Sequence, residues 1–403
     1  MSHSDESLSL EKYQVVLSGV CALIITVGLA RFAYTPMLPI MNKEAGLSLL
    51  AGGWLATFNY IGYIIGALVA ANLSDLRVKY SAYKICLVVS LVSTAAMGAT
   101  TDLAIWSVLR AVSGVTSVAG MLLSSGLVMN WLLRKGLRQE LGLHFTGIGA
   151  GIIVSGVAII AMADYFNWAQ QWYWLATLGL AFFPPAYLWM PEPLKSRPSA
   201  EGQAKVIKSS SAWMKILIAF YFFTGFGYAI GATFIVAILS KFDFFAGMGS
   251  LVWIIVGCAA IPASFLWDKV AKSTSTIFAL ILANLLETVA IIIPRFTDDA
   301  VINIVGAALF GSTFVGIVSL TLALVGRKYP DNPAKAMAKL TISYGVAQIV
   351  APAAAGYMAA TYGGYNDCLV LTGIALSIGT FLLFLLRATK EQESAWALSR
   401  QPE

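Results

Sequence analysis

The sequence predicts an all-helical polytopic membrane protein with twelve transmembrane helices arranged as two six-helix bundles. Three observations support this fold class: an apolar composition, long apolar runs along the whole chain, and one polar interruption near its middle. Of the 403 residues, 59% are hydrophobic and only 11% are charged, and the mean hydropathy is +0.79. A soluble domain of this composition would expose large apolar patches, so the composition excludes that class.

The apolar runs are long enough for a helix to cross a hydrocarbon core about 30 Å thick. They lack period-two alternation, so we expect helices and not the strands of a membrane barrel. The predicted spans are, in chain order, residues 13–40, 49–74, 81–99, 103–133, 141–162, 171–190, 213–239, 248–267, 274–293, 300–326, 337–360 and 368–387.

The N-terminal segment, residues 1–12, is polar and carries Asp5, Glu6 and Glu11. A cleaved signal peptide would begin with basic residues and have a shorter apolar region, so we expect the first span to be retained. Lysine and arginine are distributed unequally between the two sets of loops. This asymmetry predicts cytoplasmic N- and C-termini, and it explains the net charge of +6 without a nucleic-acid partner.

The polar interruption is rich in Pro, Ser, Lys and Gly, which is typical of a cytoplasmic linker. The predicted organisation is a tail at 1–12, a bundle at 13–190, a linker at 191–212, a second bundle at 213–387 and a tail at 388–403. The two bundles resemble each other at an offset of roughly 193 to 198 residues; Asp75 and Asp268, for example, each end a span and precede basic residues. Parallel repeats of this kind imply a transporter that rocks about a central site.

Several motifs resemble the major facilitator superfamily. The segment AANLSDLRVKY keeps Asp75 and Arg77 of the superfamily's loop signature, but it has Ala71 in place of Gly and Leu76 in place of Arg. The segment RAVSG, which begins at Arg110, resembles the Arg-x-x-x-Gly motif of the fourth helix. GLARFAYTPMLP, GGWLATFNYIGYIIGAL, GFGYAIGATFI and YGVAQIVAPAAAG are more narrowly similar to the YbfB/YjiJ group.

The resemblance covers essentially the whole chain and implies the major facilitator fold, in which helices 1, 4 and 7 line a central cavity. Members of the YbfB/YjiJ group are mostly assigned as transporters without a settled substrate. In the fifth span, GIGAGIIVSG lacks the Gly-Pro that ends the antiporter signature, which argues against a simple drug/proton antiporter.

Two arginines lie within predicted spans, where a charge costs at least about 2.5 kcal/mol. With a rise of 1.5 Å per residue, Arg31 lies about 24 Å along the first span and Arg110 about 10 Å below the outer surface, with Tyr228 at a similar depth. Such guanidinium groups could bind a carboxylate, sulfonate or phosphate. Alternatively, Arg31 snorkels to the interface or braces carbonyls freed near Pro36 and Pro39, and Arg110 makes a packing hydrogen bond.

Other polar residues are candidates for the same site. Asn59 and Tyr63 are spaced i, i+4, as are Tyr344 and Gln348, and Tyr34 lies three residues after the first arginine. We expect these side chains to contact the substrate, with polar bonding between helices as the alternative.

The segment around Arg31 in the first span also contains two residues that shape its backbone. Gly28 is expected to allow a neighbouring helix to approach, and Pro36 to end the rigid part of the first helix. Whether Arg31 points into the cavity between the halves decides its interpretation.

Proton-coupling candidates are Glu287, which shares a helix face with Asn284, and His144, which lies beside Glu140 near the cytoplasmic face. A structural partner is the alternative for Glu287, and an interfacial bystander is the favoured interpretation of His144.

A cytoplasmic gate is predicted from the charged ends of the second and eighth spans. Asp75 with Arg77, and Asp268 with Lys269, are expected to latch the two halves together on this side. Ordinary helix termination is the alternative.

Four cysteines are scattered singly, and the chain has only two histidines and no HExxH, paired intramembrane acids or nucleophile motif. We therefore predict no enzymatic activity, metal or cofactor.

The predicted function is secondary active transport of a small organic solute, anionic in character, across the bacterial inner membrane by alternating access. Its expected partners are the solute, protons as the candidate coupling ion, and membrane lipids, with no nucleic acid, and we expect a monomer. The alternative is a proton-linked exporter of apolar or cationic drugs; a non-transporting sensor of the same fold would need a signalling appendage.

Overall fold

The computed structural model describes residues 3–137, 141–194, 212–245, 249–329 and 333–388. Most of the predicted linker at 191–212 and of the predicted tail at 388–403 lies outside these ranges. The longer helical segments are α1 (His3–Leu23), the π-helix η1 (Ile24–Phe32), α2 (Tyr34–Glu44), α3 (Leu49–Asn72), α4 (Leu76–Ala96), α5 (Leu103–Val118), the π-helix η3 (Ala119–Leu123), α6 (Ser124–Arg134), α7 (Gly142–Met162), α8 (Trp168–Leu188), α9 (Ala212–Leu239), α10 (Gly249–Ser273), α11 (Thr276–Phe296), α12 (Ala300–Lys328), α13 (Pro333–Tyr362) and α14 (Asn366–Arg387). Short 3-10 turns occur at Met97–Ala99 and Asp243–Phe245, and no strand occurs within the described ranges.

The all-helical membrane fold is confirmed. Each of the twelve predicted spans coincides with a helical segment, and ten such segments are long and apolar enough to cross a membrane. The remaining two, α8 and α13, are also long, but they carry more polar residues, such as Gln170 and Gln171 in α8. The helical part of the chain also begins earlier than predicted, because α1 starts at His3.

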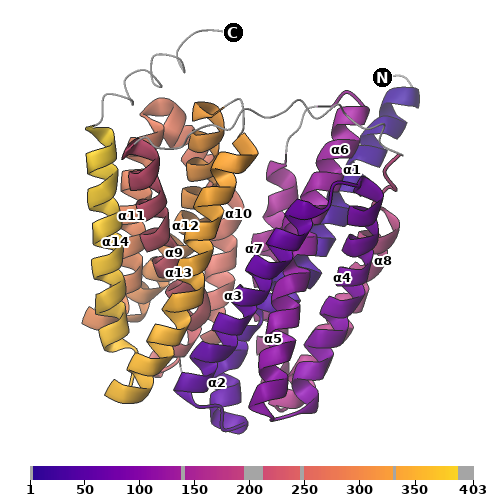
Figure 1. Cartoon of the computed structure of the whole chain (residues 1–403). Helices are drawn as coiled ribbons and strands as arrows, with labels where there is room; N and C mark the ends of the chain where they lie inside the picture. Colours follow the sequence, from indigo (N-terminus) through magenta and orange to yellow (C-terminus); the bar gives the residue numbers. More distant parts are fainter. Residues whose placement is uncertain (1–2, 138–140, 195–211, 246–248, 330–332, 389–403) are drawn as a thin grey trace.

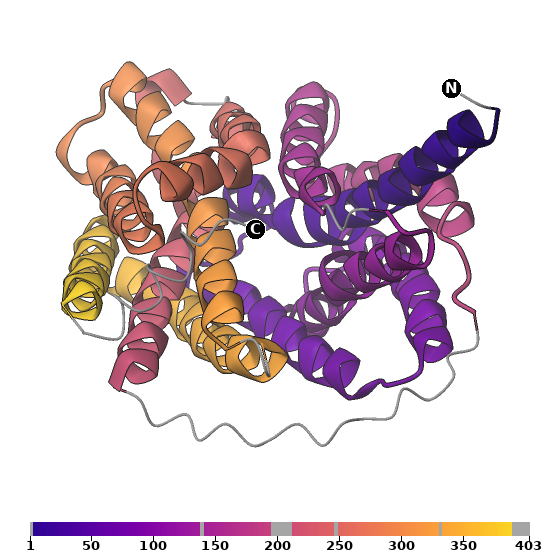
Figure 2. The same cartoon turned by 90° about the horizontal axis from the view of Figure 1, so that it is seen from above.

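The helices form two groups that follow the sequence. Figure 1 shows α1 to α8, drawn in indigo and magenta, on one side, and α9 to α14 on the other, with both chain ends at the same end of the molecule. Figure 2 shows the two groups from that end. They meet where α3 packs on α13, α7 on α10 and α2 on α9. We call these groups the N-terminal and C-terminal halves.

Close helix packing in both halves depends on glycines. A Cβ at Gly62 of α3 would collide with the carbonyl oxygen of Ala111 in α5, and a Cβ at Gly114 would collide with that of Asn59. Between the halves, a Cβ at Gly53 would collide with the Pro352 carbonyl of α13. In each case the missing side chain allows one helix backbone to touch another.

The first span is one continuous run of helix that changes its winding. It passes from α1 through the π-helical η1, which contains Gly28 and Arg31, into α2. Gly28 lies against the backbone of Gly151 in α7, so the expected close approach is present.

The expectation that Pro36 ends the rigid helix is wrong, because α2 continues to Glu44 with Pro39 inside it. Pro36 comes directly after the change of winding, in the first turn of α2, so its missing N–H falls where the helical hydrogen-bond register already changes.

A second π-helix interrupts the fourth span and faces the first. Gly120 of η3 lies against Thr26 of η1, where a Cβ would collide with the Thr26 hydroxyl oxygen. The two irregular stretches therefore pack on each other, and π-helical turns are frequent at functional sites.

We expect the substitution Gly62→Ala to lower the melting temperature, because a methyl group has no room beside the Ala111 carbonyl and overpacking typically costs about 1–3 kcal/mol. The matched control is Gly126→Ala in α6, where a Cβ would meet nothing within 4 Å. There the better helix propensity of alanine should leave stability unchanged or slightly raised. Intrinsic tryptophan fluorescence during heating in detergent measures both variants, and equal melting temperatures would contradict the packing argument.

Candidate functional site

Arg31 is buried, with 6% of its surface exposed, in the π-helix η1. Its guanidinium carbon Cζ lies 4.6 Å from the ring centre of Tyr63, 4.9 Å from that of Tyr60 and 5.6 Å from that of Phe32. Within the described part of the chain, no hydrogen bond or ion pair reaches this side chain. Arg31 is thus a buried charge surrounded by aromatic rings, with its N–H donors unused.

Arg110 is also buried, but one of its donor groups is engaged, whereas its Nε has no hydrogen-bond partner among the described residues. Its Nη1 donates to the carbonyl oxygens of Ala30 at 3.3 Å and Arg31 at 3.4 Å, and its Cζ lies 4.2 Å from the ring centre of Tyr34. Both carbonyls belong to η1, where the helical hydrogen-bond register changes. The structure thus brings the two arginines together, as their common depth predicts, and gives them different contacts. Arg110 makes the packing hydrogen bond that was its alternative interpretation.

Two further predicted site residues hold helices together. The Asn59 side-chain amide donates to the Arg110 carbonyl at 3.0 Å and to the Ser113 hydroxyl at 2.7 Å, which links α3 to α5. The Tyr34 hydroxyl donates to the Gly52 carbonyl at 2.9 Å, which links α2 to α3. For both residues, the contacts match the alternative of polar bonding between helices.

The C-terminal half adds aromatic rings that pack against those around Arg31. The Tyr228 ring centre is 6.5 Å from that of Tyr60, 5.6 Å from that of Tyr344 and 5.4 Å from that of Phe314. Tyr344 in turn lies 4.5 Å from Tyr221. We define the aromatic cluster as the set Tyr60, Tyr63, Tyr221, Tyr228, Phe314 and Tyr344.

Sequence reasoning included Tyr63, Tyr228 and Tyr344, and it missed the other three members of the cluster. A signal was available for two of them. Tyr60 precedes Tyr63 by three residues, and Tyr221 precedes Tyr228 by seven, so each pair shares a helix face.

Gln348 lies one turn after Tyr344 on α13 and is buried. Its Oε1 has no hydrogen-bond partner among the described residues, although an amide in this position can accept up to two bonds. The next residue, Ile349, accepts a bond from the Thr57 hydroxyl of α3 at 2.9 Å. Gln348 therefore lies beside the contact between the halves with an unused acceptor.

Glu287 of α11 is 1% exposed, and its Oε1 has no hydrogen-bond partner among the described residues. Its helix, α11, packs on α12, which carries Phe314 of the aromatic cluster. Asn284, on the same face, accepts a bond from Thr224 at 2.8 Å and donates to Thr380 at 2.8 Å, so it fastens α9, α11 and α14 together. The two polar residues thus differ: Asn284 is fully bonded, and Glu287 retains an unsatisfied oxygen.

His144, the third residue of α7, is completely buried inside the N-terminal half. Its ring occupies the space left by the absent side chain of Gly19 in α1, with Val128 of α6 beside it. Neither ring nitrogen has a hydrogen-bond partner among the described residues. Glu140, expected beside it, lies outside the described residues.

The predicted gate residues make contacts within their own halves. Asp75 caps α4 by accepting the backbone N–H of Arg77 at 2.8 Å, and Asp268 pairs with Lys272 at 2.7 Å one turn along α10. Among the ion pairs between described residues, none links Asp75, Arg77, Asp268 or Lys269 across the halves. The halves are instead bonded on the side opposite the chain ends, where the Thr35 hydroxyl donates to the Ala232 carbonyl.

Residues 23–384 match the family model described as "Uncharacterised MFS-type transporter YbfB". The chain belongs to this family of major facilitator transporters. It is therefore a multi-pass membrane protein of a transporter family, and the family implies a small-molecule solute. The family and the fold point to a transporter and not to an enzyme.

Solved structures share the major facilitator fold. The nucleoside transporter NupG superposes with a TM-score of 0.73 at 13% identity, over 94% of this chain and 98% of that one. A bacterial homologue of the human lysosomal transporter Spinster, solved in an inward-facing and unoccupied conformation, has a TM-score of 0.69 at 13% identity, over 93% and 97% of the two chains. The human organic anion transporter TETRAN has a TM-score of 0.65 at 15% identity, over 92% and 99%. No curated protein gave a significant sequence match.

The different contacts of the two arginines predict different effects on the stability of this major facilitator transporter. We expect Arg110→Gln to lower the melting temperature by several degrees, because the carbonyls of Ala30 and Arg31 lose their buried donor at a cost of about 1–3 kcal/mol. Arg31→Gln removes a charge that has no bonded partner and should not destabilise the protein. Thermal unfolding of the two purified variants, side by side with the wild type, is the measurement. A greater loss in the Arg31 variant would reverse the assignment.

Proposed function

We propose that the protein is a secondary active transporter that moves a small organic anion across the bacterial inner membrane by alternating access of its two halves. The observation that carries this proposal is Arg31, a buried guanidinium without a hydrogen bond or counter-ion among the described residues. We further propose that both chain ends are cytoplasmic, as the lysine and arginine asymmetry indicates, and that the protein works as a monomer.

The cost of burying the Arg31 charge has to be offset by the stabilisation that its contacts provide. A charge within the hydrocarbon region costs at least about 2.5 kcal/mol. A cation–π contact contributes about 0.5 kcal/mol when exposed and about 2 kcal/mol when desolvated, but it leaves the five guanidinium N–H donors unbonded. A carboxylate, sulfonate or phosphate would supply both the missing charge and paired acceptors. A cationic drug would add a second positive charge beside Arg31, which is why the drug-exporter alternative ranks second.

The aromatic cluster supports an organic substrate over a small inorganic anion. Rings from both halves lie beside Arg31, so a bound solute can touch the N-terminal half through Tyr63 and the C-terminal half through Tyr228 and Tyr344. The unused acceptor of Gln348 can receive a donor from the solute. Contact with both halves is what alternating access requires, because binding can then favour one arrangement of the halves over another.

The remaining predicted site residues are proposed to position the site. Arg110, Asn59 and Tyr34 are bonded to backbone or to neighbouring side chains, and they fix the π-helix that carries Arg31. The gate residues Asp75 and Asp268 stay candidates for a latch that forms in another arrangement of the halves.

For proton coupling, we propose Glu287 over His144. The Glu287 carboxyl group has an unsatisfied oxygen, and its helix packs on α12, which carries Phe314 of the aromatic cluster, so a change in its charge can affect the site. His144 is packed in the N-terminal half between α1 and α6, and its described contacts do not include the cluster.

The substitution Arg31→Ala should leave folded protein in the membrane and abolish anion transport. Removing one partner of a buried charge-assisted pair costs at least about 2 kcal/mol, so affinity should fall about 30-fold or more. Proteoliposomes tested against a panel of labelled anions and cations, with and without a pH gradient, provide the measurement. The control is Lys43→Ala, which removes an exposed cation remote from the aromatic cluster.

Arg31→Lys should restore part of the anion transport, because it returns the charge without the paired donors. Unchanged anion transport in Arg31→Ala would refute the site. If cationic dyes move and anions do not, the drug-exporter function replaces the proposal.

Glu287→Gln should remove the dependence of accumulation on the pH gradient while leaving exchange of labelled for unlabelled anion intact, because exchange needs binding but no net proton movement. The matched control is Glu192→Gln, which neutralises an exposed acid after α8. Gradient-driven accumulation that persists in Glu287→Gln would exclude this residue from coupling.

A further inference from the structure

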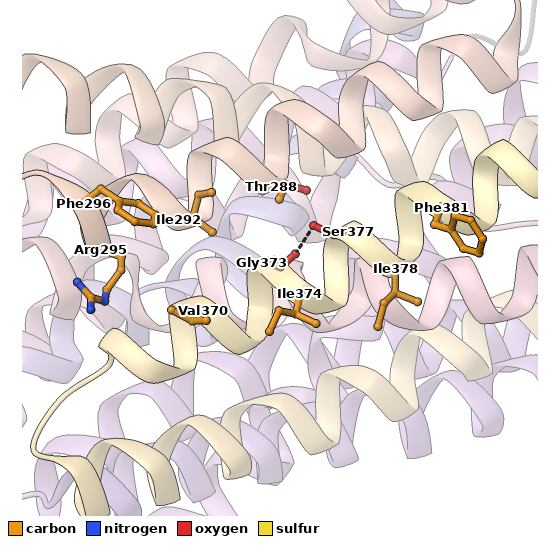
Figure 3. A pocket seen from close by; sticks show the side chains of 10 residues that line it. All are labelled: Thr288, Ile292, Arg295, Phe296, Val370, Gly373, Ile374, Ser377, Ile378 and Phe381. Atoms are coloured by element: carbon orange, nitrogen blue, oxygen red, sulfur yellow. Dashed lines mark hydrogen bonds between the residues drawn. The ribbon is translucent and has the colours of Figure 1, made fainter.

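A groove lies between α11 and α14, on the side of the C-terminal half that faces away from the N-terminal half (Figures 1 and 3). It encloses about 500 Å³, and small residues form its floor: Thr288, Gly373 and Ser377. The Thr288 hydroxyl donates to the Asn284 carbonyl at 2.7 Å, and the Ser377 hydroxyl donates to the Gly373 carbonyl at 2.7 Å. These hydroxyl protons are used within their own helices, so the floor presents a largely apolar surface to an occupant.

The walls of the groove are apolar, and one end carries a charge. Ile292 and Phe296 of α11 line one end, Ile374 of α14 lies near the middle, and Phe381 of α14 lies at the other end. Figure 3 shows Arg295 at the end near Phe296, which is the end away from the chain termini. Arg295 is exposed and has no ion pair with another described residue.

The dimensions of the groove match one leaflet of a bilayer. Along α14 it runs from Val370, beside Arg295, to Phe381, which is about 16 Å at the rise of 1.5 Å per residue. Half of a hydrocarbon core about 30 Å thick is about 15 Å. An occupant held at Arg295 would therefore reach close to the middle of the membrane at Phe381.

We propose that this groove is a binding site for an anionic phospholipid of the leaflet opposite the chain termini, with one acyl chain in the groove and the phosphate at Arg295. A guanidinium at the membrane surface pairs well with a phosphate, and the apolar walls suit a hydrocarbon chain. A helix of a second copy of the protein would instead cover the unpaired charge of Arg295 with apolar side chains. The site lies on a different surface from Arg31 and does not depend on the proposed solute.

Native mass spectrometry of the purified full-length protein, equilibrated with equal amounts of phosphatidylglycerol and phosphatidylethanolamine, tests the proposal. We expect one retained phospholipid with a preference for phosphatidylglycerol. Arg295→Gln should lower phosphatidylglycerol retention about fivefold, which corresponds to about 1 kcal/mol for one basic residue at the membrane surface. Ser377→Phe fills the groove from its exposed floor and should lower the retention of both lipids. Lys43→Gln removes an outer cation of the other half and should change neither.

Equal lipid retention in the wild type, Arg295→Gln and Ser377→Phe would overturn the proposal. So would a dimer of the wild-type protein that Ser377→Phe dissociates, because the groove would then bind a second copy of the chain. Should Ser377→Phe fail to fold, Arg295→Gln alone decides, since its side chain is exposed and unpaired.

Discussion

A positive charge in a hydrocarbon layer has to be stabilised by whatever surrounds it, and much of the site follows from this constraint at Arg31. The rings of Tyr60 and Tyr63 lie beside the guanidinium, because aromatic faces attract a cation without adding a charge of their own, and Tyr228 of the C-terminal half packs on Tyr60. The backbone that carries Arg31 is held in turn by Arg110. Arg110 is positioned by the Tyr34 ring, and its own carbonyl accepts a bond from Asn59. One buried charge thus accounts for contacts among the first, second and fourth spans.

The π-helical winding of η1 explains why a second arginine is needed there. Where a helix passes from one hydrogen-bond register to another, some carbonyls lose their usual donors, and in a membrane no water replaces them. Arg110 supplies donors to the carbonyls of Ala30 and Arg31. The change of winding comes directly before Pro36, so the missing N–H of that proline falls where the hydrogen-bond register already changes.

The sequence predicts the depth of a residue along its helix well, but it says much less about the direction in which the side chain points. The twelve spans follow from the length of the apolar runs, and Arg31, Arg110 and Tyr228 come together because the rise of a helix is constant along its axis. The different contacts of the two arginines could not be predicted, since depth does not say which way a side chain turns. The burial of His144 could not be predicted for a related reason: it depends on Gly19, a residue more than a hundred positions away in the sequence. Helical spacing could have predicted that Tyr60 and Tyr221 belong to the site, whereas the contact of Phe314 with Tyr228 depends on the packing of α12 against α9.

The nature of the contact between the halves determines what it costs to separate them. On the side opposite the chain ends, Gly53 packs against the backbone carbonyl of Pro352. The hydroxyl groups of Thr35 and Thr57 donate hydrogen bonds to backbone carbonyls of the C-terminal half. Among the ion pairs between described residues, none joins the halves. Separating the halves here gives up dispersion contacts and two neutral hydrogen bonds, and it breaks no ion pair between described residues. A contact of this kind can break and form again at low energetic cost, which is what the proposed alternating access requires of the two halves.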